Sequence, residues 1–218
     1  MVKNKKRIPS RKQVLDFMTA QSYPYRFEYV KDMQPLRVSV ERKVIYVNEK
    51  VLMDVVGRLV KDRLDWKEIM WKNIQHEKAH EIFFKWNIKW GASAADCGWL
   101  PSYLTDIVID RIYFAKNARY QKALVADSRH AFKDIKSDIW NIFPTVSSRA
   151  HFLYNQAAYW ITIGAITLDA AAELYPEKID YIAEMSQLFS KIRNENDLEW
   201  ASPQAKMIYL KSFRKTGL

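Results

Sequence analysis

The sequence contains little cysteine and little glycine. Its 218 residues include one cysteine, Cys97, and five glycines. A single cysteine excludes an intramolecular disulfide and a cysteine-based zinc finger, and it fits a reducing compartment. The spacing of the glycines excludes the dinucleotide-binding fingerprint, the phosphate-binding loop and the Gly-x-Ser-x-Gly nucleophile motif.

Long hydrophobic runs are also missing. The most apolar stretch, residues 157–168, is too short to span a bilayer. The first dozen residues are charged and no apolar stretch follows them, so no secretory signal is visible. We therefore expect a soluble cytoplasmic protein that does not bind a membrane.

Basic residues are concentrated at the two ends of the chain. The net charge is +10, yet residues 1–12 hold six basic and no acidic residues, and residues 203–218 hold four basic and no acidic residues. The intervening part is balanced, with 25 residues of each sign. Basic tails can contact nucleic acid, or they can serve as solvated ends that aid solubility.

The spacing of apolar residues predicts an α+β protein that is predominantly helical. Ser10 and Gln13 match a capping box for a helix over 11–19, and alternation between 25 and 47 predicts a small antiparallel N-terminal sheet of two or three strands. Further helices are expected after Asn48 and at 66–86, 102–120, 128–141, 147–165, 177–193 and 203–214, with a loop over 89–101.

These elements predict a single domain. A basic tail at 1–12 precedes a core at 25–115, in which the sheet packs on the helix at 66–86. A helical C-terminal region follows at 116–218.

The helix expected at 66–86 carries a His-Glu-x-x-His motif. His76 and His80 are four residues apart, so both imidazoles lie on one face of a helix and can bind one metal ion. Glu77 lies about 100° round the helix from His76, where it can reach a water molecule on that ion. A zinc ion lowers the pKa of a water molecule bound to it, and a nearby carboxylate can then take the proton.

A catalytic zinc ion normally has three protein ligands. Asp106 and Asp110 lie one turn apart on the next expected helix. Asp106 is placed to complete the zinc ligands, and Asp110 to accept the N–H of a ligand histidine and fix its tautomer. Other side chains of suitable type are alternatives for the third ligand: Asp110, Asp96, His130 and His151.

The motif helix followed by a carboxylate on a second helix resembles the gluzincin and aspzincin metallopeptidases. Asp106-x-x-x-Asp110 is similar to the Glu-x-x-x-Asp segment of the thermolysin-like members, with Asp in the place of their Glu. The resemblance implies that Asp106 is the third ligand and Asp110 the carboxylate behind it. It also implies a Tyr or His that stabilises the transition state, for which Tyr103 and His151 are candidates.

The sequence therefore predicts a zinc metallopeptidase that cleaves protein or peptide substrates. His76, His80 and Asp106 would hold Zn²⁺, and Glu77 would act as the general base. The alternative is a non-catalytic, nucleic-acid-associated binding protein with a zincin-like fold, which would use its basic tails to bind.

Overall fold

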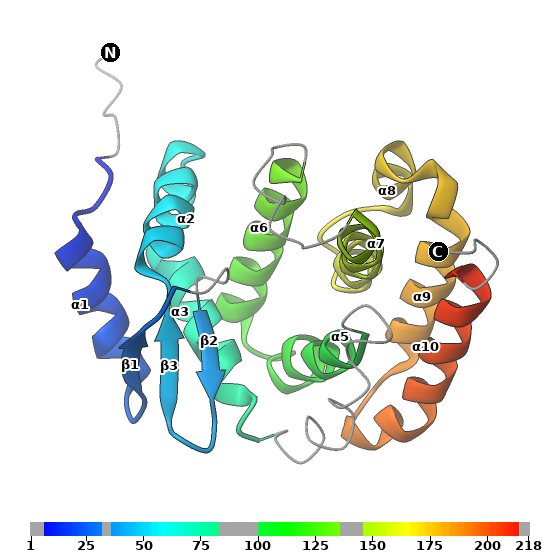
Figure 1. Ribbon diagram of the computed structural model, residues 1–218, viewed down its shortest axis with the longest axis horizontal. Coiled ribbons are helices and arrows are strands. Elements are labelled where there is room, and N and C mark those ends of the chain that lie inside the picture. Colours follow the sequence, from blue (N-terminus) through cyan, green and yellow to red (C-terminus); the bar gives the residue numbers. More distant parts are fainter. Residues whose placement is uncertain (1–6, 32–35, 83–99, 136–145, 214–218) are drawn as a thin grey trace. The chain divides into compact units, whose positions relative to one another are not determined.

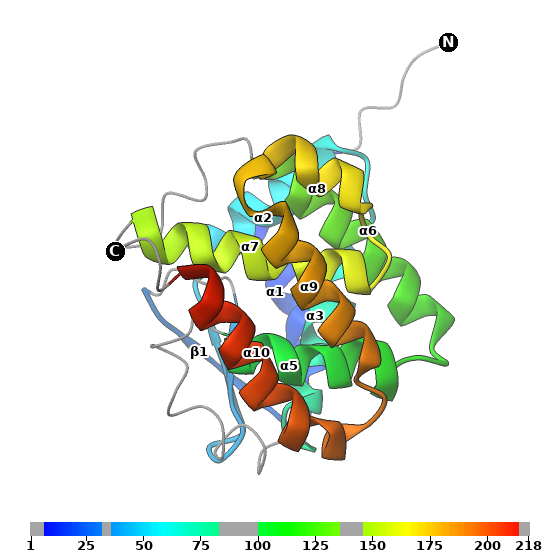
Figure 2. The same ribbon diagram turned by 90° about the vertical axis from the view of Figure 1, so that its right-hand side faces the viewer.

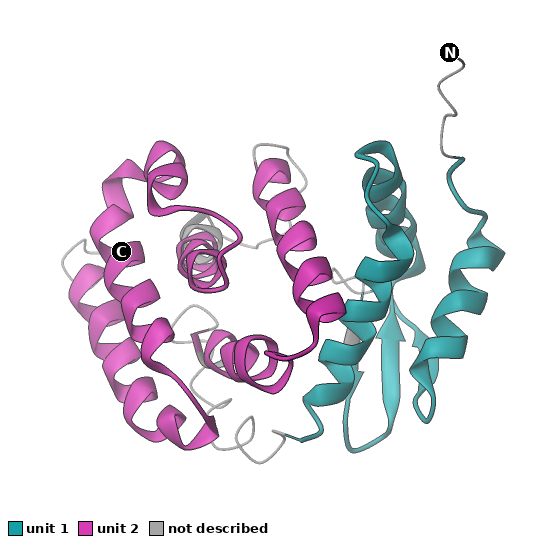
Figure 3. Cartoon of the chain, turned by 180° about the vertical axis from the view of Figure 1, so that it is seen from behind, with its two compact units in different colours: residues 1–82 teal, residues 83–218 magenta. Residues whose placement is uncertain are grey.

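A computed structural model describes residues 7–31, 36–82, 100–135 and 146–213. The chain forms two compact units, residues 1–82 and residues 83–218 (Figure 3). The fold class is the predicted one, mainly helical with a small sheet in unit 1. Within the described ranges, no helix is both long and apolar enough to cross a membrane.

The described part of unit 1 contains three helices and three strands, which are labelled in Figure 1. Side-chain caps set the helix starts: Ser10 and Gln13 form the expected capping box, and Asn48 accepts a hydrogen bond from the Val51 N–H. In chain order the elements are α1 (Arg11–Ser22), β1 (Arg26–Tyr29), β2 (Leu36–Ser39), β3 (Val44–Val47), α2 (Glu49–Lys61) and α3 (Trp66–Ala79).

The sheet is mixed, which corrects the antiparallel arrangement expected from the sequence. Its order is β1-β3-β2, with β2 and β3 antiparallel and β1 and β3 parallel. A tight turn joins β2 to β3, and Lys43 in that turn has a positive φ of 50°. β3 takes the central position, where its apolar side chains Val44, Ile45 and Val47 are buried.

The core of unit 1 joins its three helices to the sheet. Helix α3 packs against α1, α2 and β2, so the sheet lies on the motif helix as predicted. Burial of an aliphatic side chain contributes about 1.5–3 kcal/mol, and this core stabilises the scaffold that carries the histidines. Its most deeply buried members are Val14, Met18, Ile45, Leu52, Val56, Leu59 and Ile74.

The elements of unit 2 in its described residues are all helical. They are α5 (Leu100–Ile107), the π-helix η2 (Val108–Tyr113), α6 (Ala118–Asp134), α7 (Val146–Thr162), α8 (Leu168–Leu174), the short 3₁₀ turn Pro176–Lys178, α9 (Ile179–Lys191), the 3₁₀ turn Glu195–Asp197 and α10 (Leu198–Phe213). Helix α7 packs on α9, and α10 packs on both α9 and α5; Figure 2 shows α9 and α10 side by side.

Several helix limits differ from the sequence prediction. The helix expected at 102–120 ends at Tyr113, and a new helix begins after Asn117, whose side chain accepts from the Tyr120 N–H. The helix expected from Pro203 begins at Leu198, after a turn capped by Asn194 and Asp197. Helix α8 was not predicted.

Candidate metal centre

Helix α3 and the residue that follows it carry the motif, and a side-chain cap defines where the helix starts. The Asp65 side chain accepts hydrogen bonds from the N–H groups of Lys67 and Glu68, at 3.0 and 3.4 Å, and so starts the helix at Trp66. The helix ends at Ala79, which is shorter than the expected 66–86. His80 follows with helical φ and ψ angles of −56° and −23°. It therefore keeps its place one turn beyond His76.

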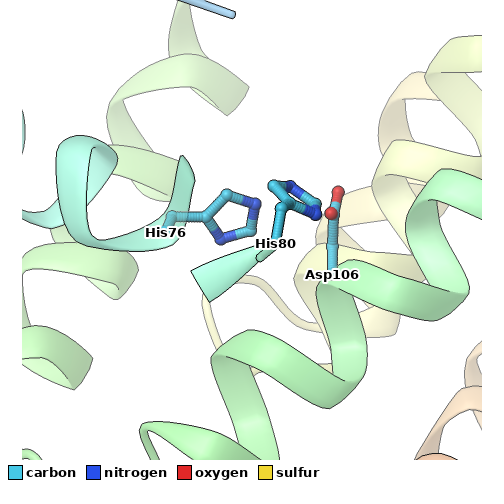
Figure 4. A group of neighbouring side chains, drawn as sticks. All are labelled: His76, His80 and Asp106. Atoms are coloured by element: carbon cyan, nitrogen blue, oxygen red, sulfur yellow. The ribbon is translucent and has the colours of Figure 1, made fainter. Parts of the chain in front are cut away.

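The two imidazoles of the histidine pair, His76 and His80, lie side by side (Figure 4). Their ring centroids are 4.9 Å apart with an interplanar angle of 85°, and their metal-binding nitrogens come within 4.8 Å of each other. Both side chains are half-buried. Tetrahedral zinc with bonds of about 2.0–2.1 Å holds two nitrogens about 3.4 Å apart, so a small rotation of the side chains closes the pair on one ion.

Glu77 lies next to His76 on the same helix and is half-buried. In an α-helix it lies about 100° round the axis from His76. The Glu77 carboxylate therefore lies beside the helix face that carries the two histidines and would not itself bind the metal ion. The position suits a proton acceptor for a water molecule close to the ion.

The end of α3 is tied to the sheet of unit 1. The Tyr25 hydroxyl donates to Glu81 Oε2 at 2.7 Å, and the Lys43 ammonium group pairs with the other oxygen. Hydrogen bonds from Lys43 and then from Tyr25 lower the pKa of Glu81. Lys78 Nζ donates to the Tyr23 carbonyl at 2.8 Å. These contacts hold the turn that contains His80.

Asp106 is the carboxylate that the sequence proposes as third ligand. It lies near the end of α5, in unit 2, and it is half-buried. Two imidazoles and one carboxylate are the ligand types of many catalytic zinc sites. By residue type, His76, His80 and Asp106, which are labelled in Figure 4, thus match such a ligand set.

Asp110 is buried in η2, with an exposed fraction of 1%. The Tyr120 hydroxyl donates a hydrogen bond to Asp110 Oδ1, and the Tyr159 hydroxyl donates one to Asp110 Oδ2. The sequence predicts that Asp110 accepts an imidazole N–H, whereas both of its oxygens accept from tyrosines here. Burial, then the charge of Asp110, raise the pKa of Tyr159 and keep it a donor.

Tyr103 also lies on α5, and its side chain is buried. Its hydroxyl is 3.1 Å from Gln156 Oε1 and 3.4 Å from the Phe152 carbonyl, both on α7. Burial, followed by the charge of Asp106, raises the pKa of Tyr103 and keeps the hydroxyl protonated. The residue therefore remains a donor at neutral pH.

His151 lies on α7 within a cluster of aromatic side chains. Its Nδ1 is 2.8 Å from the Tyr209 hydroxyl, and its ring centroid is 4.0 Å from that of Phe213. Burial and then the charge of Lys178 lower the pKa of His151. These contacts join α7 to α10.

The remaining alternatives for a third ligand are His130 and Asp96. His130 is buried on α6, with its Nε2 3.5 Å from Asp134 Oδ2. Asp96 and the single cysteine, Cys97, are outside the described residues.

Two residues of this region were missed by the sequence analysis. Tyr120 and Tyr159 hold the buried carboxylate of Asp110, although they lie ten and 49 residues further along the chain. The Asn117 cap gives a local signal for the position of Tyr120. No local pattern marks Tyr159, because its contact depends on how α7 packs.

Comparisons with protein-family models, with curated proteins and with solved structures found no match to this chain.

Proposed function

We propose that the protein is a zinc-dependent metallopeptidase that hydrolyses peptide bonds in protein or peptide substrates. The observation that carries the proposal is the histidine pair, whose ring centroids are 4.9 Å apart at half-buried positions in the last turn of α3 and directly after it. The Glu between the two ligands completes the motif. This combination supplies both a metal site and a proton acceptor on one short segment.

A zinc ion held by the pair would lower the pKa of its water to about 7 and polarise the substrate carbonyl. Glu77 would accept a proton from the attacking water and pass it to the leaving amine. Tyr103 and His151 stay candidates for a donor to the developing oxyanion. The neighbours of Tyr103, Gln156 and Phe152, already engage its hydroxyl.

Asp106 is our assignment for the third ligand. Its half-buried carboxylate, one turn before Asp110, supports this choice. Asp110 is the weaker candidate because tyrosine hydroxyls occupy both of its oxygens, and metal binding would have to displace them. The bonds to Asp110 instead fix the helical turn that follows Asp106.

Metal content tests the site. The full chain, purified without chelator, should contain one zinc ion, and His76→Ala or His80→Ala should lose it. Asp106→Ala should weaken zinc binding by about 10–100-fold or more. Gln75→Ala, on the same helix, is the matched control and should bind zinc as the unaltered chain does. Zinc binding that survives loss of both histidines would contradict the site.

Hydrolysis tests the function. The zinc-loaded chain should cleave a fluorescently labelled, denatured protein, lose this activity to a chelator and regain it with zinc. Zinc at the pair without hydrolysis, across folded, denatured and peptide substrates, would contradict the peptidase proposal and favour the non-catalytic alternative.

A further inference from the structure

A groove lies at the opposite end of α3 from the histidine pair, entirely within unit 1. It has a volume of about 830 Å³ and forms where the N-terminal ends of α1 and α3 come together. Ten residues of helix, about 15 Å, separate Trp66 in the groove from His76. The lining includes Arg7, Ile8, Asp16, Phe17, Trp66 and Lys67.

Two aromatic rings form one wall of this groove. Phe17 and Trp66 meet edge to face, with centroids 5.3 Å apart, and both are half-buried. Both pack on the core of unit 1, so their positions are fixed before any ligand arrives. Rings held in this way, with part of their surface in a groove, are suitable platforms for a flat ligand.

Two cationic side chains, Lys67 and Arg7, line the groove together with the aromatic wall. Lys67 Nζ lies 5.8 Å from the centroid of Trp66 and 6.0 Å from that of Phe17. Arg7 also lines the groove and is exposed. Asp16 is the acidic member of the lining. In the sequence, Lys3, Lys5 and Lys6 come shortly before Arg7, so positive charge dominates this end of the chain.

We propose that this groove binds single-stranded nucleic acid. A base would stack against Trp66 and Phe17, and the phosphates beside it would pair with Lys67 and Arg7. Aromatic side chains beside cations are the usual composition of single-strand sites, since every base has a flat face. In a duplex the faces of the bases stack on one another and are not free to stack on the rings. An acidic peptide would form ion pairs with the cations but would place no base against the rings.

Fluorescence anisotropy with the full chain and a labelled oligothymidylate of about 12 nucleotides tests the proposal. Lys67→Gln should weaken binding and reduce the slope of log affinity against log salt by about 0.7. Trp66→Leu should weaken binding about 5- to 150-fold with little change in that slope. Lys61→Gln removes an exposed cation outside the lining and should lower affinity less than Lys67→Gln.

Three results would overturn the proposal: no binding at low salt, equal binding by both groove variants and the unaltered chain, or equally tight binding of an oligoglutamate. The second would assign the affinity to the basic tails alone, and the third would assign the groove to acidic peptides. Lys67 is exposed, so its variant remains informative if Trp66→Leu does not fold. Zinc content and hydrolysis should be unchanged in Lys67→Gln, which separates this proposal from the peptidase.

Discussion

The Tyr25 hydroxyl donates a 2.7 Å hydrogen bond to Glu81, across 56 residues of sequence. Tyr25 precedes β1, and Glu81 directly follows His80. The bond therefore connects the start of the sheet to the turn that carries the second histidine of the motif. Lys43, in the turn before β3, binds the same carboxylate. The end of the motif helix is held by the sheet rather than by further helical turns.

Removal of this bond should loosen the turn at His80. Tyr25→Phe removes only the hydroxyl, because the buried ring would remain in place. The lost hydrogen bond should lower the free energy of unfolding by about 1 kcal/mol and weaken zinc binding. Urea unfolding and zinc competition measure the two effects. Tyr29→Phe, at an exposed tyrosine of β1, is the control and should change neither quantity. Unchanged zinc affinity in Tyr25→Phe would contradict a role in positioning His80.

The Glu81 carboxylate gives this link a pH dependence. Its folded-state pKa is lowered below the usual 4.5, first by the hydrogen bond from Lys43. The contribution to stability is therefore present above pH 4.5 and is lost as the pH falls through the folded-state pKa. Glu81→Gln should be less stable than the unaltered chain at pH 7, and the difference should shrink in acid. A difference that grows below pH 4.5 would contradict this assignment.

His151 should make the stability of unit 2 decrease in mild acid. Burial, then Lys178, lower its folded-state pKa below the usual 6.5, so the unfolded chain binds a proton more readily. The stability is fully present above pH 6.5 and falls as the pH drops towards the folded-state pKa. His151→Phe should reduce this dependence in thermal unfolding from pH 7.5 to 5. The same slope in both proteins would show that other groups cause it.

The stability of the fold around η2 should depend on the hydrogen bonds that Tyr120 and Tyr159 donate to the buried carboxylate of Asp110. Tyr159→Phe removes one hydrogen bond to a buried charge and should lower the free energy of unfolding by about 1.5–3 kcal/mol. Tyr113→Phe, at an exposed tyrosine of the same π-helix, should change it by less than about 0.5 kcal/mol. Equal stabilities of the two variants would contradict the role of the Asp110 pair of bonds.

The sequence predicted the parts of the fold that depend on local chemistry. Side-chain caps at Ser10 and Asn48 marked the starts of α1 and α2, because each cap accepts a hydrogen bond from the N–H group three residues further along. The spacing of His76 and His80 likewise fixed their shared face. Local patterns therefore identified the histidine pair before any tertiary contact was known.

The parts that were missed depend on distant contacts. β3, the more apolar strand, lies between β1 and β2 and pairs in parallel with β1, and the local alternation of apolar residues predicts neither the order nor the direction of the strands. The helix expected to reach 86 ends at Ala79, where Glu81 turns to the sheet. The tyrosines on Asp110 follow from the packing of α6 and α7 around η2, which no short motif records.

Glu77→Gln provides the most direct test of the central claim. The substitution keeps the shape of the side chain and removes its ability to accept a proton. Zinc content and hydrolysis of a labelled, denatured protein should be measured on the same preparations, with Gln75→Ala as control. The account predicts one zinc ion per chain in both variants and a 10²- to 10⁴-fold loss of hydrolysis, roughly, in Glu77→Gln alone. Full hydrolysis by zinc-loaded Glu77→Gln would contradict the account.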